Sequence, residues 1–170
     1  MPAGRTALVV LVPEADVAIG DHRLRHDANA ARGVPAHVTV LFPFRSPVDA
    51  PTSEQVAGIC RDMAPFEARF ESVGRFPGDV VWLAPEPAET FGALLAVTAD
   101  GFPDCPPYGG TVPHPIPHLT VGDFMSIADA DDLSAALAPA LPITTFVSEL
   151  TLLLEDDAGR WAIGHRWPLG

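Results

Sequence analysis

The chain has 170 residues and a net charge of −12, with 22 acidic residues against 10 basic ones, and every basic residue is an arginine. This length suits one domain or two closely packed lobes. Because affinity for long nucleic acid depends on neutralising many phosphates, the acidic balance argues against an extended RNA or DNA groove, but it allows a single phosphate in a local pocket.

The two cysteines, Cys60 and Cys105, form no CxxC pair, and the apolar run at residues 7–12 is too short for a secretory leader. No run approaches the roughly 20 apolar residues that a membrane span needs. We therefore expect a cytoplasmic protein with no membrane partner. Since nothing in the sequence indicates a coiled coil or an extended interface, we expect a monomer.

The first half of the chain predicts a strand, a helix, a strand and a helix. The first apolar run is nearly continuous, which favours a central strand covered on both faces. Pro43 and Pro47 favour an edge position or an early end for the second strand. Thr52 and Gln55 have capping-box spacing at the start of the second helix, and residues 27–33 are predicted as a loop. The predicted elements are 6–12, 14–26, 37–44 and 51–63.

The second half predicts a hairpin, a helix, a short strand, a helix and a closing hairpin. Residues 77–79 have hairpin turn chemistry, and Ser126 suits a helix cap. The segment 101–117 holds six prolines and three glycines, which predicts a stiff loop that rims the site next to it. This order of elements indicates an α+β fold with mixed or antiparallel sheets and helices on the outer faces. The predicted strands are 66–76, 80–84, 118–123, 144–154 and 161–167, and the helices run from 85–87 to 99 and over 127–138.

A His-x-Thr-x motif occurs twice, at residues 37–40 and 118–121, and the two histidines are 118 − 37 = 81 residues apart. This spacing suggests an internal duplication with one motif in each lobe. Since side chains alternate along a strand, His37 and Thr39 share one strand face, as do His118 and Thr120. Two such strands related by a pseudo-twofold axis would present two imidazoles and two hydroxyls to one cleft, which suits an anion.

These four side chains match the needs of in-line displacement at phosphorus. Imidazole titrates near neutral pH, so one ring can act as a base on the incoming oxygen while the other protonates the leaving oxygen. The threonine hydroxyls can donate hydrogen bonds to the non-bridging oxygens, where negative charge grows in the transition state. This scheme needs no metal, no other cofactor and no covalent intermediate.

The paired motifs resemble those of the two-histidine (2H) phosphoesterase superfamily, which includes the bacterial RNA 2′,3′-cyclic phosphodiesterases, also named 2′-5′ RNA ligases. The resemblance extends over most of the chain. Further segments that carry it are Gly74-Arg75-Phe76-Pro77, Val80-Val81-Trp82-Leu83 and Ile116-Pro117-His118-Leu119-Thr120.

This resemblance implies a single bilobal α+β domain over residues 1–170, with a pseudo-twofold axis and a water-filled central cleft. It also implies hydrolysis or reversible ligation at 2′,3′-cyclic or 2′-5′ phosphodiester linkages. At the matching positions the catalytic residues are His37, Thr39, His118 and Thr120. By analogy His118 is the base and His37 the acid, although the sequence fits either polarity.

Several residues outside the motifs are candidates for binding. Arg45 and Arg75 suit bidentate contacts to a phosphate or a substrate tail, although surface or ion-paired roles fit them equally well. Tyr108 can stack on a nucleobase or anchor the proline-rich loop. His114 and His118 have the spacing of two metal ligands on a helix, but the prolines between and around them forbid that helix, so no metal site is predicted. The three tryptophans, Trp82, Trp161 and Trp167, are expected to pack in the core.

We predict a metal-independent phosphoesterase that acts on a small nucleotide or an RNA end. A single His-x-Thr motif is more often structural, and only the pair indicates function. The main alternative is a non-catalytic module that binds a phosphorylated metabolite or an RNA end, and a purely structural interaction protein is a weaker one. An open, phosphate-sized gap between the imidazoles would favour catalysis, whereas a gap closed by side chains would favour binding or structure.

Overall fold

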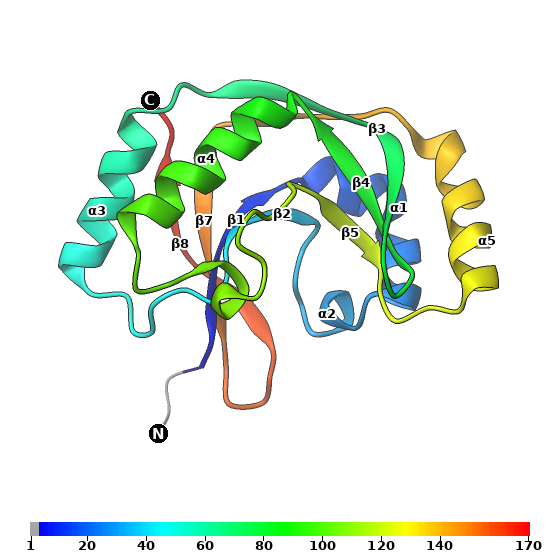
Figure 1. The fold of residues 1–170 in the computed structure, drawn as a ribbon, viewed down its shortest axis with the longest axis horizontal. Helices are drawn as coiled ribbons and strands as arrows, with labels where there is room; N and C mark the ends of the chain where they lie inside the picture. Colours follow the sequence, from blue (N-terminus) through cyan, green and yellow to red (C-terminus); the bar gives the residue numbers. More distant parts are fainter. Residues whose placement is uncertain (1–3) are drawn as a thin grey trace.

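The computed structural model describes residues 4–170, so the first three residues of the expected domain lie outside the described part. Its strands form two four-stranded sheets in which every pairing is antiparallel. The predicted α+β class with antiparallel sheets is therefore confirmed (Figure 1). Within residues 4–170, no helix is both long enough and apolar enough to cross a membrane.

The first sheet combines both ends of the chain. Its strand order is β2-β1-β7-β8, and β1 is buried on both faces, as its continuous apolar run predicted. The first motif lies on β2, which is an edge strand of this sheet. The bounds are β1 Thr6–Leu11, β2 His37–Leu41, β7 Glu149–Glu155 and β8 Trp161–Pro168.

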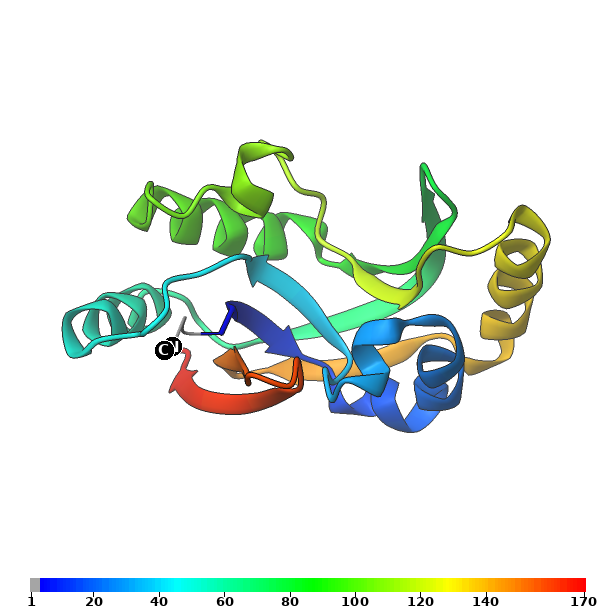
Figure 2. The same cartoon turned by 90° about the horizontal axis from the view of Figure 1, so that it is seen from below.

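The second sheet is built from the middle of the chain. Its order is β5-β4-β3-β6, and the second motif lies at the start of β5, again an edge strand. The two motif strands contact each other, although each is hydrogen-bonded only to its own sheet (Figure 2). The bounds are β3 Phe66–Phe76, β4 Val80–Glu86, β5 Leu119–Gly122 and β6 Ile143–Val147.

Figure 1 shows α3 and α4 at one end of the molecule and α1 and α5 at the other. Helix α1 packs on β5 and β6 of the second sheet although it follows β1 of the first sheet in the chain. We call each sheet with its helices a lobe. Helix α4 contacts both β2 and β4, so it packs against both lobes. The helices are α1 Pro13–His26, α2 Ala28–Ala31, α3 Ala50–Arg61, α4 Ala88–Gly101 and α5 Ile127–Leu137, with 3₁₀ turns η1 Pro107–Gly110 and η2 Ala138–Ala140.

The predicted strand over 144–154 is wrong, because it is two strands in different sheets. Strand β6 pairs with β3, and after Ser148 the chain enters β7, which pairs with β1. Their burial patterns explain the division. Alternate residues of β6 are buried, as suits an edge strand, whereas β7 has a continuous buried run, as suits a central one.

Three local predictions also need correction. The expected loop at 27–33 contains the short helix α2, which begins behind Asp27, whose carboxylate accepts a hydrogen bond from the Asn29 N–H. Helix α3 is capped by Asp49 instead of Thr52, because the Asp49 carboxylate reaches the Thr52 N–H at 2.9 Å. Strand β2 ends at Leu41, three residues before the predicted end.

Candidate active site

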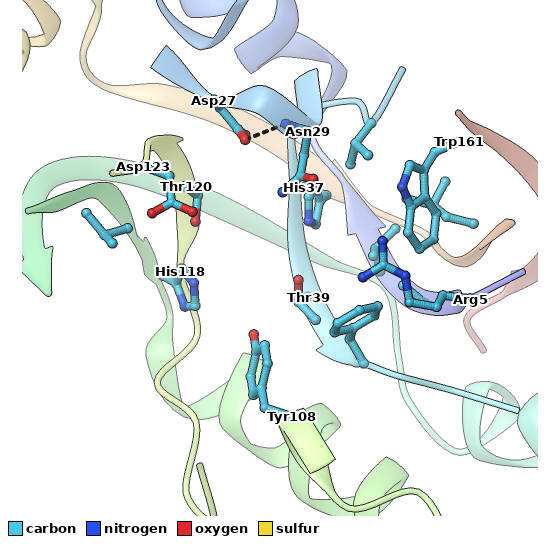
Figure 3. A pocket seen from close by; sticks show the side chains of 16 residues that line it. Arg5, Asp27, Asn29, His37, Thr39, Tyr108, His118, Thr120, Asp123 and Trp161 are labelled. Atoms are coloured by element: carbon cyan, nitrogen blue, oxygen red, sulfur yellow. Dashed lines mark hydrogen bonds between the residues drawn. The ribbon is translucent and has the colours of Figure 1, made fainter. Parts of the chain in front are cut away.

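A cavity of about 330 Å³ lies between the lobes and is lined by side chains from both sheets. All four motif side chains that the sequence singled out reach it, as Figure 3 shows. Tyr108 from the proline-rich loop also lines it. The structure therefore brings together five of the seven predicted site residues, namely His37, Thr39, Tyr108, His118 and Thr120.

The two histidines are held in the same way. The Nδ1 atom of His37 lies 2.7 Å from the carbonyl oxygen of Pro35, and the Nδ1 atom of His118 lies 2.7 Å from that of Ile116. Because a carbonyl can only accept a hydrogen bond, each Nδ1 must carry the proton. Each neutral ring therefore keeps Nε2 free, with a lone pair that can accept a proton from a ligand in the cavity.

Burial lowers the pKa of both imidazoles. The pKa of His37 falls to about 4, mainly through burial, with a further lowering from the positive charge of Arg23. The hydrogen bond to Pro35 and the negative charge of Asp27 act in the opposite direction. Burial also lowers the pKa of His118 below its usual value. Both rings are thus neutral at pH 7, and a bound anion would raise both pKa values.

The hydroxyl groups lie on the same strand faces as the histidines. Along β2, His37 and Thr39 are half-buried at the cavity while Val38 and Val40 are buried in the core, which is the predicted alternation. In Figure 3 the Tyr108 hydroxyl points into the space between the motifs. Burial raises the pKa of this phenol, an effect that the neighbouring Thr39 hydroxyl opposes, so Tyr108 is a hydrogen-bond donor at neutral pH.

An aromatic wall stands behind His118. Phe76 meets the imidazole edge-on with the ring centroids 4.9 Å apart, and Trp82 stacks on Phe76 at 4.7 Å. Gly74 lies opposite Trp82 in the β3–β4 ladder, and a Cβ atom there would lie 2.4 Å from the indole. This wall is formed by two of the segments that carried the family resemblance. Trp82 is half-buried and supports His118, so its role is wider than core packing.

Arg45 and Arg75 do not line the cavity. The Arg45 guanidinium makes two hydrogen bonds to Asp104, at 2.9 and 2.7 Å, and lies over the Phe102 ring. It thereby ties the proline-rich loop to the end of the first motif segment. Arg75 is paired with Asp79 and Asp131. Both guanidinium groups were predicted to bind a phosphate, but in the structure each is ion-paired with nearby carboxylates.

The proline-rich loop does border the site. The Tyr108 N–H donates to the carbonyl of Phe42 at 2.7 Å, which attaches the loop to the residue after β2. Tyr108 has a φ of 51°, an uncommon value for a residue with a side chain. The loop is therefore held against the first lobe with its one tyrosine directed into the cavity.

Six polar or aromatic side chains at the cavity were not predicted. Arg5 has its guanidinium 5.8 Å from the centroids of both the Phe42 and Trp161 rings, and it is paired with Glu155. Trp161 corrects the expectation of core packing, since it lines the cavity. None of these side chains belongs to a motif, and their approach depends on contacts between distant segments. They are Arg5, Asp27, Asn29, Phe42, Asp123 and Trp161.

The described chain offers no evident metal centre. Among residues 4–170, no group of three or more histidine, cysteine or acidic side chains is arranged to hold an ion. His114 is exposed and does not line the cavity with His118. The polar groups at the cavity are the two imidazoles, the hydroxyls of Thr39, Thr120 and Tyr108, the Arg5 guanidinium, the Asn29 amide and the carboxylates of Asp27 and Asp123.

The fold and the paired motifs define a two-lobed α+β protein with a polar cavity between its sheets. The family model of the 2′-5′ RNA ligase superfamily matches residues 11–159. The chain therefore belongs to the 2′-5′ RNA ligase superfamily, and this membership supports a phosphoesterase- or ligase-type function. No curated protein matches the sequence.

Solved structures share the fold at low sequence identity. LigT of E. coli in complex with 3′-AMP has a TM-score of 0.64 and 18% identity, with 98% of each chain covered. LigT in complex with NADP+ has a TM-score of 0.63 and 18% identity, with 99% of each chain covered. TT0787 of Thermus thermophilus has a TM-score of 0.64 and 20% identity over 97% of each chain. At these identities the likeness shows the fold alone.

Proposed function

We propose that this protein is a metal-independent phosphoesterase that acts on a 2′,3′-cyclic phosphate or a 2′-5′ phosphodiester of an RNA end or a small nucleotide. The observation that carries the proposal is the matched anchoring of the two histidines. Each Nδ1 is bound to the carbonyl two residues earlier at 2.7 Å, so both rings offer Nε2 to one open cavity. An open gap between the imidazoles favours catalysis over a purely structural role.

In the proposed reaction, water attacks the phosphorus of the cyclic phosphate. The Nε2 atom of one imidazole takes a proton from the water as the new P–O bond forms. The bond from phosphorus to the ribose oxygen breaks, and the other imidazole, in its protonated form, gives its Nε2 proton to that oxygen. We assign His118 as the base and His37 as the acid, with Thr39 and Thr120 donating to the non-bridging oxygens. In ligation a ribose hydroxyl takes the place of water in the same attack: its oxygen forms the new bond to phosphorus, one bond from phosphorus to a ring oxygen breaks, and a phosphodiester results.

The negative charge of the substrate explains how one imidazole becomes protonated. Both imidazoles are neutral in the free protein, because burial lowers their pKa values. A phosphate anion in the cavity favours the protonated form of a neighbouring ring, so substrate binding itself supplies the acid. We infer that the chain works as one bilobal domain, since the cavity takes one histidine and one threonine from each lobe.

The experiment is hydrolysis of the four nucleoside 2′,3′-cyclic phosphates and of a short RNA with a cyclic phosphate end, in the presence of EDTA. We expect turnover by the wild type and a loss of about 10²-fold or more in His37→Ala and in His118→Ala. His114→Ala, which removes an exposed histidine outside the cavity, is the matched control and keeps full activity. Binding without turnover would mean that the protein is a binding module and not an enzyme. Inhibition by EDTA would show that a metal takes part.

A second arm of this experiment assigns the two roles. An aryl phosphodiester with a p-nitrophenolate leaving group needs no proton on the leaving oxygen, so the loss of an acid costs less with it than with a ribose ester. His37→Ala should therefore regain most of its activity on the aryl ester, whereas His118→Ala should not. The opposite pattern would exchange the acid and the base.

A further inference from the structure

Arg23 on α1 is a buried cation that belongs to neither motif. Its side chain is 2% exposed. Burying a guanidinium is costly unless all its donors are paired, and replacing a buried ion pair by apolar residues is often neutral or even stabilising. Stability alone therefore does not account for an arginine at this position.

The partners of Arg23 lie in or close to both His-x-Thr motifs, and we call each motif with its strand a half-site. Its Nε donates to the carbonyl of Thr120 in the second motif at 3.3 Å. Its Nη1 donates to the carbonyl of Val34 at 3.2 Å, three residues before His37. One side chain thus forms a direct polar link between the segments that carry the two catalytic histidines.

Two carboxylates extend the link towards the first motif. Asp27 binds Nη2 of Arg23 at 3.0 Å and caps α2 through the Asn29 N–H. Asp16 lies 3.4 Å from Nη1 and accepts the N–H of Ala36, the residue before His37, at 3.0 Å. The positions of α2 and of the first motif strand therefore both depend on this buried charge network.

No pair of hydrogen-bonded strands links the two motifs directly. Strand β2 pairs with β1 and β5 pairs with β4, and each lies at the edge of its own sheet. Strand pairing therefore fixes each motif within its own sheet but does not set the distance between the two motifs at the cavity. In-line displacement depends on that distance, since a misplacement of 1 Å can cost about 10²-fold in rate.

We propose that Arg23 is a positioning residue that sets the separation and relative orientation of the two His-x-Thr half-sites. This inference rests on the proposed function. Arg23 does not line the cavity and touches no reacting atom, so its effect is on the rate of the chemical step more than on substrate affinity. The fork of the guanidinium matters because one ammonium cannot reach the partners on both segments in the same geometry.

The test compares three variants that are chosen so that the protein still folds. Arg23→Met combined with Asp27→Asn removes the cation and its buried counter-ion together, and asparagine retains the capping oxygen. Asp16 stays solvated in this variant, because its side chain is 41% exposed. Arg23→Lys is the conservative variant. Arg25→Met, on the exposed side of the same helix, is the matched control.

On a nucleoside cyclic phosphate, we expect the double variant to lose about 10²-fold in kcat while KM changes only a few-fold. Arg23→Lys should fall between it and the wild type, and Arg25→Met should match the wild type. Rates are referred to the folded fraction measured by urea unfolding. A double variant that keeps kcat within about twofold, or an equal loss in Arg25→Met, would overturn the proposal.

Binding provides a readout that does not depend on turnover. With labelled histidines, 3′-AMP added to the wild type should shift the imidazole signals of His37 and His118 with one common Kd. In the double variant the Kd should change only a few-fold, but the bound-state positions of the two imidazole signals should differ from those of the wild type, because the rings no longer meet the ligand in the same geometry. Identical bound-state signals in both proteins would contradict the proposal. If the wild type binds 3′-AMP but turns over no substrate, the proposed function fails while the role of Arg23 is still decided.

Discussion

At the scale of single residues, the same local hydrogen bond orients both histidines and leaves the Nε2 atom of each ring free to accept a proton. The hydrogen bond from Nδ1 to the carbonyl two residues earlier fixes the tautomer and the ring plane in both motifs. The acceptors are backbone carbonyls of the same short segment, that of Pro35 in one copy and that of Ile116, the residue before Pro117, in the other. The duplicated sequence therefore encodes a duplicated geometry.

The lowered pKa values predict an acid-shifted activity profile. The value of kcat/KM reports the free protein, in which one imidazole must be neutral and the other protonated. Only the singly protonated pair of rings is active, so the acid limb of the profile lies near the lower pKa, that of His37 at about 4, and the alkaline limb lies at the lowered pKa of His118. Because the pKa of His118 is also lowered, we expect the optimum of kcat/KM below pH 6.5.

This prediction is measured with a nucleoside cyclic phosphate from pH 4 to 9 at constant ionic strength. The profile of kcat should lie at higher pH than that of kcat/KM, since the bound anion raises both pKa values. An optimum of kcat/KM at or above pH 6.5 would contradict the lowered pKa values of the two imidazoles.

At the scale of elements, the β3–β4 hairpin supports His118 through a chain of aromatic contacts. Trp82 stacks on Phe76, and Phe76 meets His118 edge-on. The indole fits only because Gly74 has no side chain opposite it. A hairpin that the sequence predicts correctly thus also fixes part of the site.

Gly74→Ala should displace this wall. The added Cβ would lie 2.4 Å from the Trp82 ring, so the indole must shift. We expect a stability loss of about 1–3 kcal/mol from overpacking, and a fall in kcat of about 10-fold as His118 loses its support. Urea unfolding and cyclic phosphate hydrolysis measure the two effects.

Gly92→Ala in α4 is the control for this substitution, because a Cβ there meets nothing within 4 Å. It should raise stability by about 0.5–1 kcal/mol, as expected for alanine within a helix, and leave kcat unchanged. Wild-type kcat in a folded Gly74→Ala protein would show that the aromatic wall does not orient His118.

At the scale of the whole molecule, the net charge of −12 opposes the approach of anionic substrates. Salt screens this repulsion, and the Debye length is about 10 Å at 0.1 M. We therefore expect kcat/KM for a short RNA with a cyclic phosphate end to rise as KCl increases from about 20 to 200 mM. This is the opposite of the behaviour of proteins that bind nucleic acid by neutralising many phosphates.

A nucleoside cyclic phosphate, which carries a single charge, is the control substrate for this series and should show a shallower rise. A steep fall of kcat/KM with salt for the RNA would mean that a basic surface recognises its backbone. It would contradict the prediction that the protein has no long nucleic-acid groove.

The sequence by itself determined most of the elements, the α+β class and the four motif residues at the cavity. These depend on interactions within a few residues, such as the alternation that places His37 and Thr39 on one face of β2 or the Ser126 cap of α5. Such features follow from local backbone geometry, so a single sequence is enough to predict them.

Only the tertiary structure decided which other side chains reach the site. Arg23 bonds to Thr120 across 97 residues of chain, and Trp161 reaches the cavity from the closing hairpin. Arg45 and Arg75 matched a phosphate site in sequence, but acidic partners brought close by folding occupy their guanidinium groups. The physical reason is that these contacts depend on how whole elements pack, and packing between distant segments leaves no periodic pattern in the sequence.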